Sequence, residues 1–156
     1  MRHPSRRNPQ RGTGHESSPL ERKEEVKLKN YTSGIPAHTT ISYIEAYLAD
    51  CGVSGIAKEF NPQKQPSALY FNIDLGDKKY TIRLPANIEQ VQESLWRDYC
   101  TSTRRPRKTK EDFVDQASRT AWKIQQDWVQ VQMTLVKLKQ ADFRQVFLAY
   151  IWDGSQ

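Results

Sequence analysis

The sequence has few of the residues from which metal sites and disulfides are built. It contains two cysteines and three histidines in 156 residues, and neither type follows the spacing of a zinc motif or a disulfide framework. His3 and His15 lie near the N-terminus, and His38 stands apart from them. The scarcity of cysteine favours a reducing compartment, and we expect no metal and no cofactor.

Long apolar runs are also missing. No stretch approaches the roughly 20 apolar residues of a transmembrane helix, and the N-terminus has no apolar signal-peptide core. From these two absences we expect a soluble, cytoplasmic protein that has no membrane partner.

Enzyme motifs are absent as well. The chain has no glycine-rich phosphate loop, no nucleophile elbow, no His-Glu-x-x-His stretch and no Cys–His pair at a useful spacing. Carboxylates such as Glu93 and Asp127 occur singly in helical patterns, which is typical of a solvated helix face. We therefore expect a protein that is not an enzyme.

Positive charge is plentiful and unevenly distributed. The net charge is +6, to which residues 1–30 contribute +4 and residues 101–110 contribute +5, whereas the rest of the chain sums to −3. A protein that grips a polyanion with its folded surface usually has its positive charge on that surface. We therefore expect a mildly acidic body whose positive charge lies on a tail and a loop.

Composition divides the chain into a tail and one domain. Residues 1–32 are rich in arginine, proline and serine and poor in aliphatic side chains, so we expect a disordered basic tail. Residues 33–154 contain enough apolar side chains for a single α+β domain, with a basic loop at 101–111.

Apolar periodicity predicts elements in the order α-β-β-β-α-α-α. A first helix, capped by Thr39 or Thr40, ends at Gly52. Runs with a period of two predict strands, and Gly76-Asp77 predicts a two-residue hairpin turn between the last two. The expected strands cover residues 55–60, 67–75 and 78–84. Their expected core face consists of Leu69, Phe71, Ile73, Leu75, Tyr80, Ile82 and Leu84. We expect a three-stranded antiparallel meander that is packed on one face by helices.

Three helices follow the expected meander. Asn87, Asp112 and Asp142 are the candidate N-caps, and the helix after Asp112 is the longest, from about residue 113 to 138. Its apolar residues form a seam with alternating spacings of three and four, beside a second stripe, so we expect packing on two sides. The seam consists of Val114, Ala117, Ala121, Ile124, Trp128, Val131, Leu135 and Leu138, and the stripe of Trp122, Val129 and Val136.

The loop before the long helix admits two interpretations, a solvated linker or a phosphate clamp that gains free energy by counterion release. On the second interpretation, the protein is a nucleic-acid-binding accessory protein that contacts the phosphate backbone without base specificity, with DNA favoured over RNA. Its contacts would be Arg104, Arg105, Arg107, Lys108 and Lys110, helped by Arg2, Arg6, Arg7 and Arg11 of the tail.

Two related nucleic-acid sites have less support. The order α-β-β-β-α is that of a double-stranded-RNA-binding domain, but residues 84–94 lack the lysine cluster that such domains place before the second helix. The polar face of the sheet would carry Tyr70, Asn72, Lys79, Thr81 and Arg83. A single aromatic residue makes a poor stacking platform, so a solvated or covered face is the simpler explanation.

A protein partner is the alternative to a nucleic acid. The protein would then be an adaptor, an inhibitor or a structural homo-oligomer that uses the apolar face of helix 113–138 and the final segment. Trp122, Trp128 and Val129 form the candidate partner surface. The acidic body favours this hypothesis, and the two basic segments favour the first.

Three stretches carry a resemblance to a known set of proteins. They are "IPAHTTISYIEAYLADCGVSGI", "TIRLPANIEQV" and "RTAWKIQQDWVQVQMTLVKLKQADFRQVFLAYI", and together they span about residues 35–152. In these stretches the chain resembles a family of small uncharacterised proteins of phages and mobile genetic elements. The resemblance implies a phage or mobile-element setting, in which a protein partner would be a host or phage protein, for example in evasion of host defence. It implies no activity for any residue.

Overall fold

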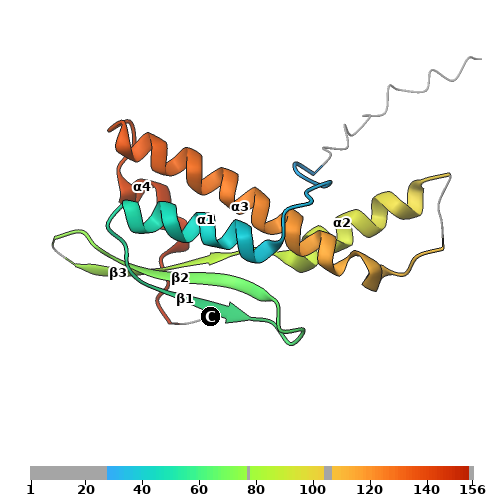
Figure 1. The fold of residues 1–156 in the computed structure, drawn as a ribbon. Coiled ribbons are helices and arrows are strands. Elements are labelled where there is room, and N and C mark those ends of the chain that lie inside the picture. The colour runs from blue at the N-terminus through green and yellow to red at the C-terminus, as the bar shows by residue number, and fades with distance from the viewer. Residues whose placement is uncertain (1–27, 77, 104–106, 155–156) are drawn as a thin grey trace, which may run out of the picture.

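The computed structural model describes residues 28–76, 78–103 and 107–154 (Figure 1). The order and mixed class of its elements confirm the fold predicted from the sequence. They are α1 (Ala37–Asp50), β1 (Ser54–Phe60), β2 (Pro66–Asp74), β3 (Lys79–Pro85), α2 (Ile88–Thr101), the 3-10 turn η1 (Lys110–Phe113), α3 (Val114–Lys137), α4 (Phe143–Phe147) and the 3-10 turn η2 (Leu148–Tyr150).

The three strands form an antiparallel meander in the order β1-β2-β3. Phe71 in the central strand pairs with Ile56 on one side and Ile82 on the other. Because successive side chains point to opposite faces, Leu69 and Leu84 lie on the same face as Phe71 and Ile82, and these four side chains are buried. The predicted core face is therefore confirmed.

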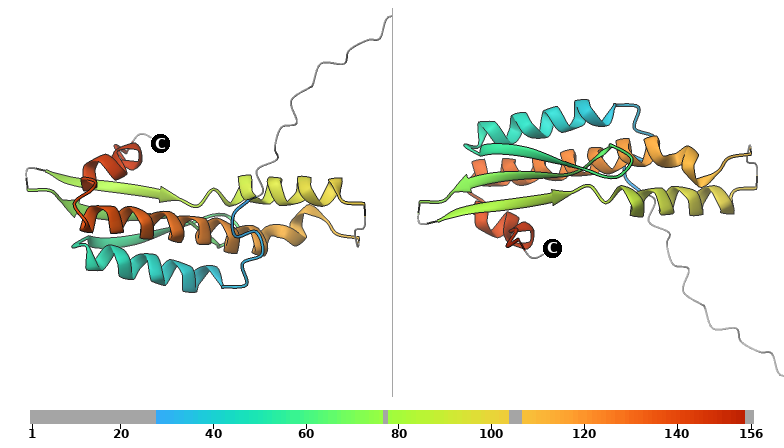
Figure 2. Two further views of the ribbon diagram at one scale, coloured as in Figure 1. Left: turned by 90° about the horizontal axis from the view of Figure 1, so that it is seen from above. Right: turned by 90° about the horizontal axis from the view of Figure 1, so that it is seen from below.

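Helices cover this apolar face. α1 and α3 lie side by side across it, whereas α2 continues past the end of the sheet beside the first half of α3 (Figures 1 and 2). The C-terminal segment returns to the free edge of β3, where Ile151 forms an isolated bridge with Ile82 and the Trp152 N–H donates to the Thr81 carbonyl at 2.8 Å. Phe143 and Phe147 of α4 are buried as well, so the last helix packs on the core.

The long helix buries most of the second stripe and the first part of the predicted seam, but not the end of the seam. Ala117 and Ala121 of the seam are 0% and 2% exposed. Trp122 and Val129, from the second stripe, have no exposed surface, whereas Val131 and Leu138, from the seam, are 56% and 61% exposed. A single seam assumes one partner along the whole helix. α3 instead has α2 beside its first turns and α1 and the sheet beside the remainder, so its buried face changes along its length (Figure 2).

The predicted start of the first helix is too late. α1 begins at Ala37 with Pro36 in the N-cap position, so Thr39 and Thr40 lie inside its first turn and neither caps it. Its end is confirmed, because Gly52 follows the last turn with a φ of +81°, which costs glycine little. Gly76 in the hairpin has a φ of +87°, and Asp77 lies outside the described residues.

The other three predicted caps differ in outcome. Asn87 occupies the N-cap position of α2, but its side chain makes no capping hydrogen bond. Asp112 is not the N-cap of the long helix; it closes the preceding turn η1, where its carboxylate accepts from the Thr109 N–H at 2.7 Å. Asp142 caps α4 as predicted and accepts from the Arg144 N–H at 2.8 Å.

The described chain begins before the predicted domain boundary at residue 33. Leu28 packs against the core, and the Asn30 side chain donates to the Asp127 carboxylate on α3 at 3.0 Å. Lys29 and Lys123 form ion pairs with the same carboxylate at 2.9 and 3.0 Å. Residues 28–32 therefore belong to the folded domain, whereas residues 1–27 lie outside the described residues.

Asp127 is the centre of this contact. Burial raises the pKa of its carboxyl, but the hydrogen bonds from Asn30, Lys29 and Lys123 outweigh burial and lower the pKa from 3.8 to about 2. The N-terminal segment is thus attached to α3 by an ionised group.

Candidate nucleic-acid interface

The predicted basic loop lies at the outer end of a projection that we call the arm. The arm consists of α2, η1 and the first turns of α3, which extend together beyond the sheet (Figure 1). Residues 102–103 and 107–109 lie at the end of the arm farthest from the sheet. The chain therefore presents these residues away from the mildly acidic body.

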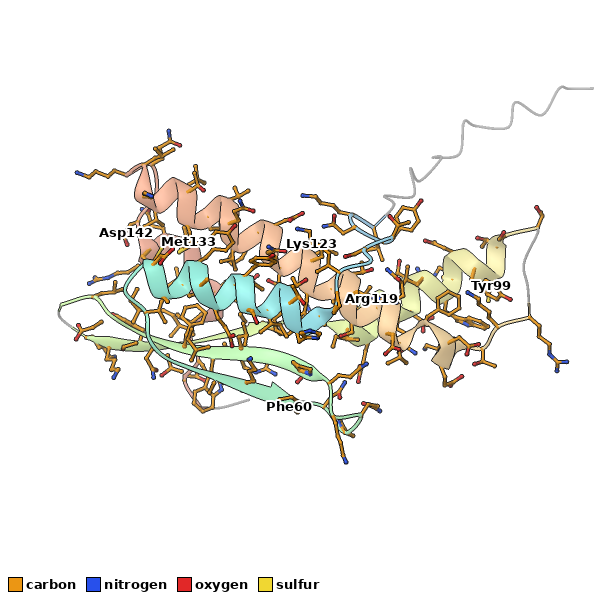
Figure 3. All side chains as sticks on the ribbon, in the orientation of Figure 1. Phe60, Tyr99, Arg119, Lys123, Met133 and Asp142 are labelled. Carbon is orange, nitrogen blue, oxygen red and sulfur yellow. The ribbon has the colours of Figure 1, made fainter. Side chains whose placement is uncertain are left out.

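Three aromatic side chains hold the outer part of the arm together. Trp96 and Tyr99, three residues apart on one face of α2, stack with their ring centres 5.4 Å apart. Phe113 of η1 packs against both, with ring centres 6.1 and 5.3 Å apart. Figure 3 labels Tyr99 near the outer end of α2. Aromatic pairs contribute roughly 0.5–1.5 kcal/mol beyond their buried area, so this cluster stabilises the packing of η1 on α2.

Two described cations of the loop are exposed. Neither Arg107 nor Lys108 forms an ion pair with a carboxylate of the described residues. The Lys108 N–H donates to the Tyr99 hydroxyl at 3.0 Å, and its ammonium lies 5.4 Å from the centre of the Phe113 ring. Lys108 is therefore positioned by the aromatic cluster while its charge faces solvent.

Lys110 differs from these two because its ammonium pairs with Glu93 on α2. The hydrogen bond from Lys110 lowers the pKa of the Glu93 carboxyl. The side chains are 42% and 44% exposed, so solvent screens this ion pair. The charge of Lys110 is thus partly neutralised. The sequence did not predict this ion pair, because Glu93 lies on another helix.

The remaining predicted contacts lie outside the described residues. They are Arg104 and Arg105 in the loop, and Arg2, Arg6, Arg7 and Arg11 in the tail.

The polar face of the sheet is occupied by the protein's own side chains. The Tyr70 hydroxyl donates to the Glu59 carboxylate at 2.6 Å, and Arg83 donates to both, at 2.9 Å to the hydroxyl and 3.2 Å to the carboxylate. The hydrogen bond from Arg83 lowers the pKa of Glu59, and the hydrogen bond to Glu59 raises the pKa of Tyr70. Trp152 packs edge-on against Tyr70 with ring centres 5.4 Å apart, so this ring is no open stacking platform.

The predicted partner surface on the long helix is wrong in its main residues. Trp122 and Val129 belong to the core, and the Trp122 indole N–H donates to the Pro66 carbonyl at 2.9 Å. Trp128 is partly buried, with its ring centre 5.5 Å from that of Phe147 and 5.2 Å from that of Tyr150. Hydrophobic periodicity could not separate these core positions from a binding surface.

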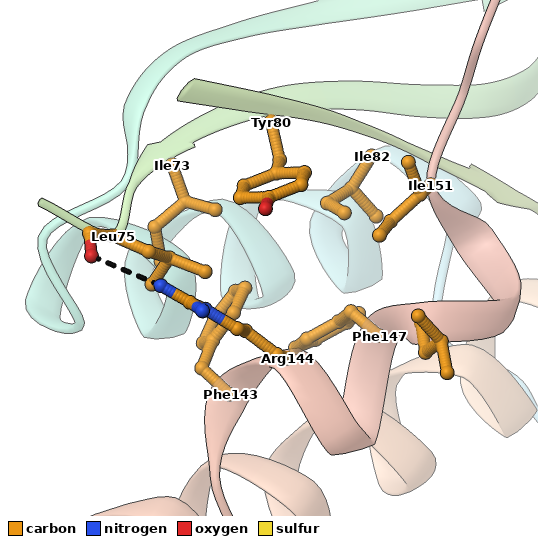
Figure 4. A pocket seen from close by; sticks show the side chains of 9 residues that line it. Ile73, Leu75, Tyr80, Ile82, Phe143, Arg144, Phe147 and Ile151 are labelled. Atoms are coloured by element: carbon orange, nitrogen blue, oxygen red, sulfur yellow. Dashed lines mark hydrogen bonds between the residues drawn. The ribbon is translucent and has the colours of Figure 1, made fainter. Parts of the chain in front are cut away.

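Other apolar side chains are exposed near the C-terminus. Leu148 is 68% exposed, and Ile151 and Trp152 are 37% and 38% exposed. Leu148 and Ile151 line an apolar cavity of ≈ 110 Å³ between the β2–β3 hairpin and α4, whereas Trp152 packs against Tyr70 (Figure 4). Arg144 lies at one side of this cavity, where its guanidinium donates to the Leu75 carbonyl at 3.2 Å.

The described residues offer neither a cluster of metal ligands nor a membrane-spanning helix. Across residues 28–76, 78–103 and 107–154, there is no group of three or more His, Cys, Asp or Glu side chains that could hold a metal ion. In the same residues, no helix combines the length and apolarity required to cross a bilayer.

Known proteins give no guide to the function, so the functional proposal depends on the residues of this chain. The chain matches no protein-family model, and no curated protein or solved structure is significantly similar to it.

Proposed function

We propose that the protein is a non-enzymatic accessory protein that binds the phosphate backbone of a nucleic acid, with DNA favoured over RNA and without base specificity. The observation that supports this most directly is the exposure of Arg107 and Lys108 at the end of the arm, where no described carboxylate pairs with them. They belong to a segment, residues 101–110, with a net charge of +5. Cations displayed in this way gain free energy by releasing counterions from a polyanion.

The setting we propose is a phage or mobile genetic element, on the basis of the resemblance in residues 35–152. An accessory protein that reads no base sequence needs affinity and a fast on-rate, and a loop on an arm provides both through electrostatic attraction.

The ion pair of Lys110 sharpens the expected salt dependence. If Glu93 keeps Lys110, four loop cations remain for phosphates, namely Arg104, Arg105, Arg107 and Lys108. Log K should then fall against log salt with a slope of about −3.6 on duplex DNA and about −2.8 on a single strand. A contribution from Lys110 would steepen the duplex slope to about −4.5.

The test replaces these four cations by serine. Binding to labelled DNA and RNA is then measured at several salt concentrations between about 50 and 200 mM, and log K is plotted against log salt. We expect the affinity to fall and the slope on duplex DNA to become shallower by about 3.6, with the remaining slope due to the tail cations and Lys110. A matched control replaces Lys78, Lys79, Lys137 and Lys139, which are exposed at the opposite end of the molecule, and should leave the slope unchanged (Figure 1). Equal slopes for the two variants would refute the proposed interface.

The second candidate function is binding to a host or phage protein, or self-association. The observation that favours it is the exposure of Leu148 and Ile151 at the apolar cavity that they line, since exposed apolar groups of this kind mark partner surfaces. Sedimentation equilibrium separates the candidates. A monomer with salt-dependent DNA binding supports the first, whereas a dimer that binds no nucleic acid and dissociates on Leu148→Ser supports the second.

A further inference from the structure

A second polar site lies away from the outer end of the arm. It is a cavity of ≈ 290 Å³ where the start of α1, the loop between β1 and β2 and the first half of α3 meet. His38 lines it from α1, Lys64 and Gln65 line it from the loop, and Asp115 and Arg119 line it from α3 (Figure 3 labels Arg119). These side chains come from three segments far apart in the sequence.

Two polar groups of this lining lack a partner. Arg119 makes no hydrogen bond or ion pair with any described residue, and its Nε is enclosed by protein atoms that offer no acceptor. Oε1 of Gln65 is likewise buried without a donor. A buried polar group without a partner costs about 1–3 kcal/mol, and more when it is charged, so such groups are rare and call for an explanation. Both side chains line one cavity, and the terminal nitrogens of Arg119 form no hydrogen bond with a described residue, which leaves them to a ligand that enters the cavity.

The charges of the lining define the class of ligand. Lys64 is exposed and forms no ion pair within the described part of the chain, so it adds a second unpaired cation to Arg119. The N–H groups of Ala37 and His38 have no acceptor among the described residues, and the first turn of α1 contains no acidic residue. Asp115 contributes a negative charge and holds the Gln65 amide at 3.4 Å. The two cations and the two N–H groups outnumber the single Asp115 carboxylate, so the lining favours an oxyanion as ligand.

We propose that this cavity binds the phosphate group of a phosphomonoester. The terminal nitrogens of Arg119 would donate to two phosphate oxygens, and Lys64 would supply a second positive charge. A monoester fits better than a backbone diester, because it offers three unsubstituted oxygens and about −1.5 to −2 charges at pH 7. The proposal is independent of the loop and of the proposed function.

The test is calorimetric titration of the full chain with inorganic phosphate and with a nucleoside 5′-monophosphate at low ionic strength. We expect Arg119→Gln to weaken binding at least about tenfold, the loss of a charge-assisted hydrogen bond. Asp115→Asn should strengthen binding several-fold, because it removes a like charge from the lining. Arg97→Gln, which makes the same change of charge at an exposed position on α2, is the control and should bind like the wild type.

Arg119→Gln should weaken binding and Asp115→Asn should strengthen it, so the test still gives a result if one of these variants does not fold. If Arg119→Gln proves unstable, a gain in affinity for Asp115→Asn still supports the site. Identical titrations for the wild type, Asp115→Asn and Arg97→Gln would overturn the proposal, as would the absence of binding by either phosphate compound. To learn whether the natural ligand is a strand end or a small molecule, binding of an oligonucleotide that carries a 5′-phosphate is compared with binding of the same oligonucleotide without it. A preference for the phosphorylated strand indicates a strand end, and tight binding of the mononucleotide without that preference indicates a small molecule.

Discussion

Asp127 should account for a measurable part of the stability at neutral pH, and Asp127→Asn is the substitution that shows it. The carboxylate accepts from Asn30 at 3.0 Å and pairs with Lys29 and Lys123 at 2.9 and 3.0 Å, with 23% of its side chain exposed. It attaches the N-terminal segment to α3. An uncharged amide at this position keeps the shape of the side chain but loses both ion pairs.

The pKa of Asp127 gives the magnitude. The pKa falls from 3.8 to about 2, and each pKa unit corresponds to 1.36 kcal/mol, so the ionised carboxylate stabilises the folded state by about 2 kcal/mol. Because the folded pKa is depressed, this stability is fully present above the unfolded pKa near 3.9 and is lost as the pH falls through about 2.

The assay is urea unfolding followed by tryptophan fluorescence at a series of pH values. We expect Asp127→Asn to be less stable than the wild type by about 2 kcal/mol at pH 7, with the difference shrinking below about pH 4 and vanishing near pH 2. Asp50→Asn is the control, because that exposed carboxylate forms no ion pair with a described residue, and its difference from the wild type should stay small at every pH.

Two outcomes would refute this reasoning about Asp127. One is a difference between wild type and Asp127→Asn that stays the same from pH 7 to pH 2, which would mean that the substitution acts through packing. The other is equal stability at pH 7, which would mean that the desolvation of the carboxylate cancels its three contacts.

Two further predictions concern the helices. Trp122→Ala should lower the free energy of unfolding by about 3–5 kcal/mol, because it empties a fully buried position. Val131→Ala, at an exposed position of the same helix, should change it by less than about 0.5 kcal/mol. Equal losses in urea titrations would contradict the assignment of the buried stripe on α3. Asp142→Ala should cost about 1 kcal/mol by removing the cap of α4, while Asp142→Asn should retain most of it, and calorimetric melting that ranks the two alike would argue against a capping role.

Features that are local to one helix or strand could be predicted from the sequence. Alternation of apolar residues identified Leu69, Phe71, Ile82 and Leu84 as a core face, and Asp142 was recognised as a cap from its own position. These features depend on neighbours within a few residues, which the sequence displays directly.

The candidate sites were less accessible to such reasoning. The phosphate-site proposal depends on Lys64 and Arg119 facing one cavity, although the β1–β2 loop and α3 are far apart along the chain. The partner of Lys110 lies on α2, and Tyr70 is covered by a tryptophan from the C-terminus. No spacing in the sequence reports these neighbours, since they are set by how the helices and strands pack.

By itself, the sequence determined the order of the elements, the apolar face of the meander and the concentration of positive charge in residues 101–110. Only the tertiary structure decided which stripe of α3 is buried, which loop cation is neutralised and which arginine lacks a partner. The physical reason is that periodicity and composition act within a segment, whereas burial and charge pairing depend on distances between segments that the chain brings together when it folds.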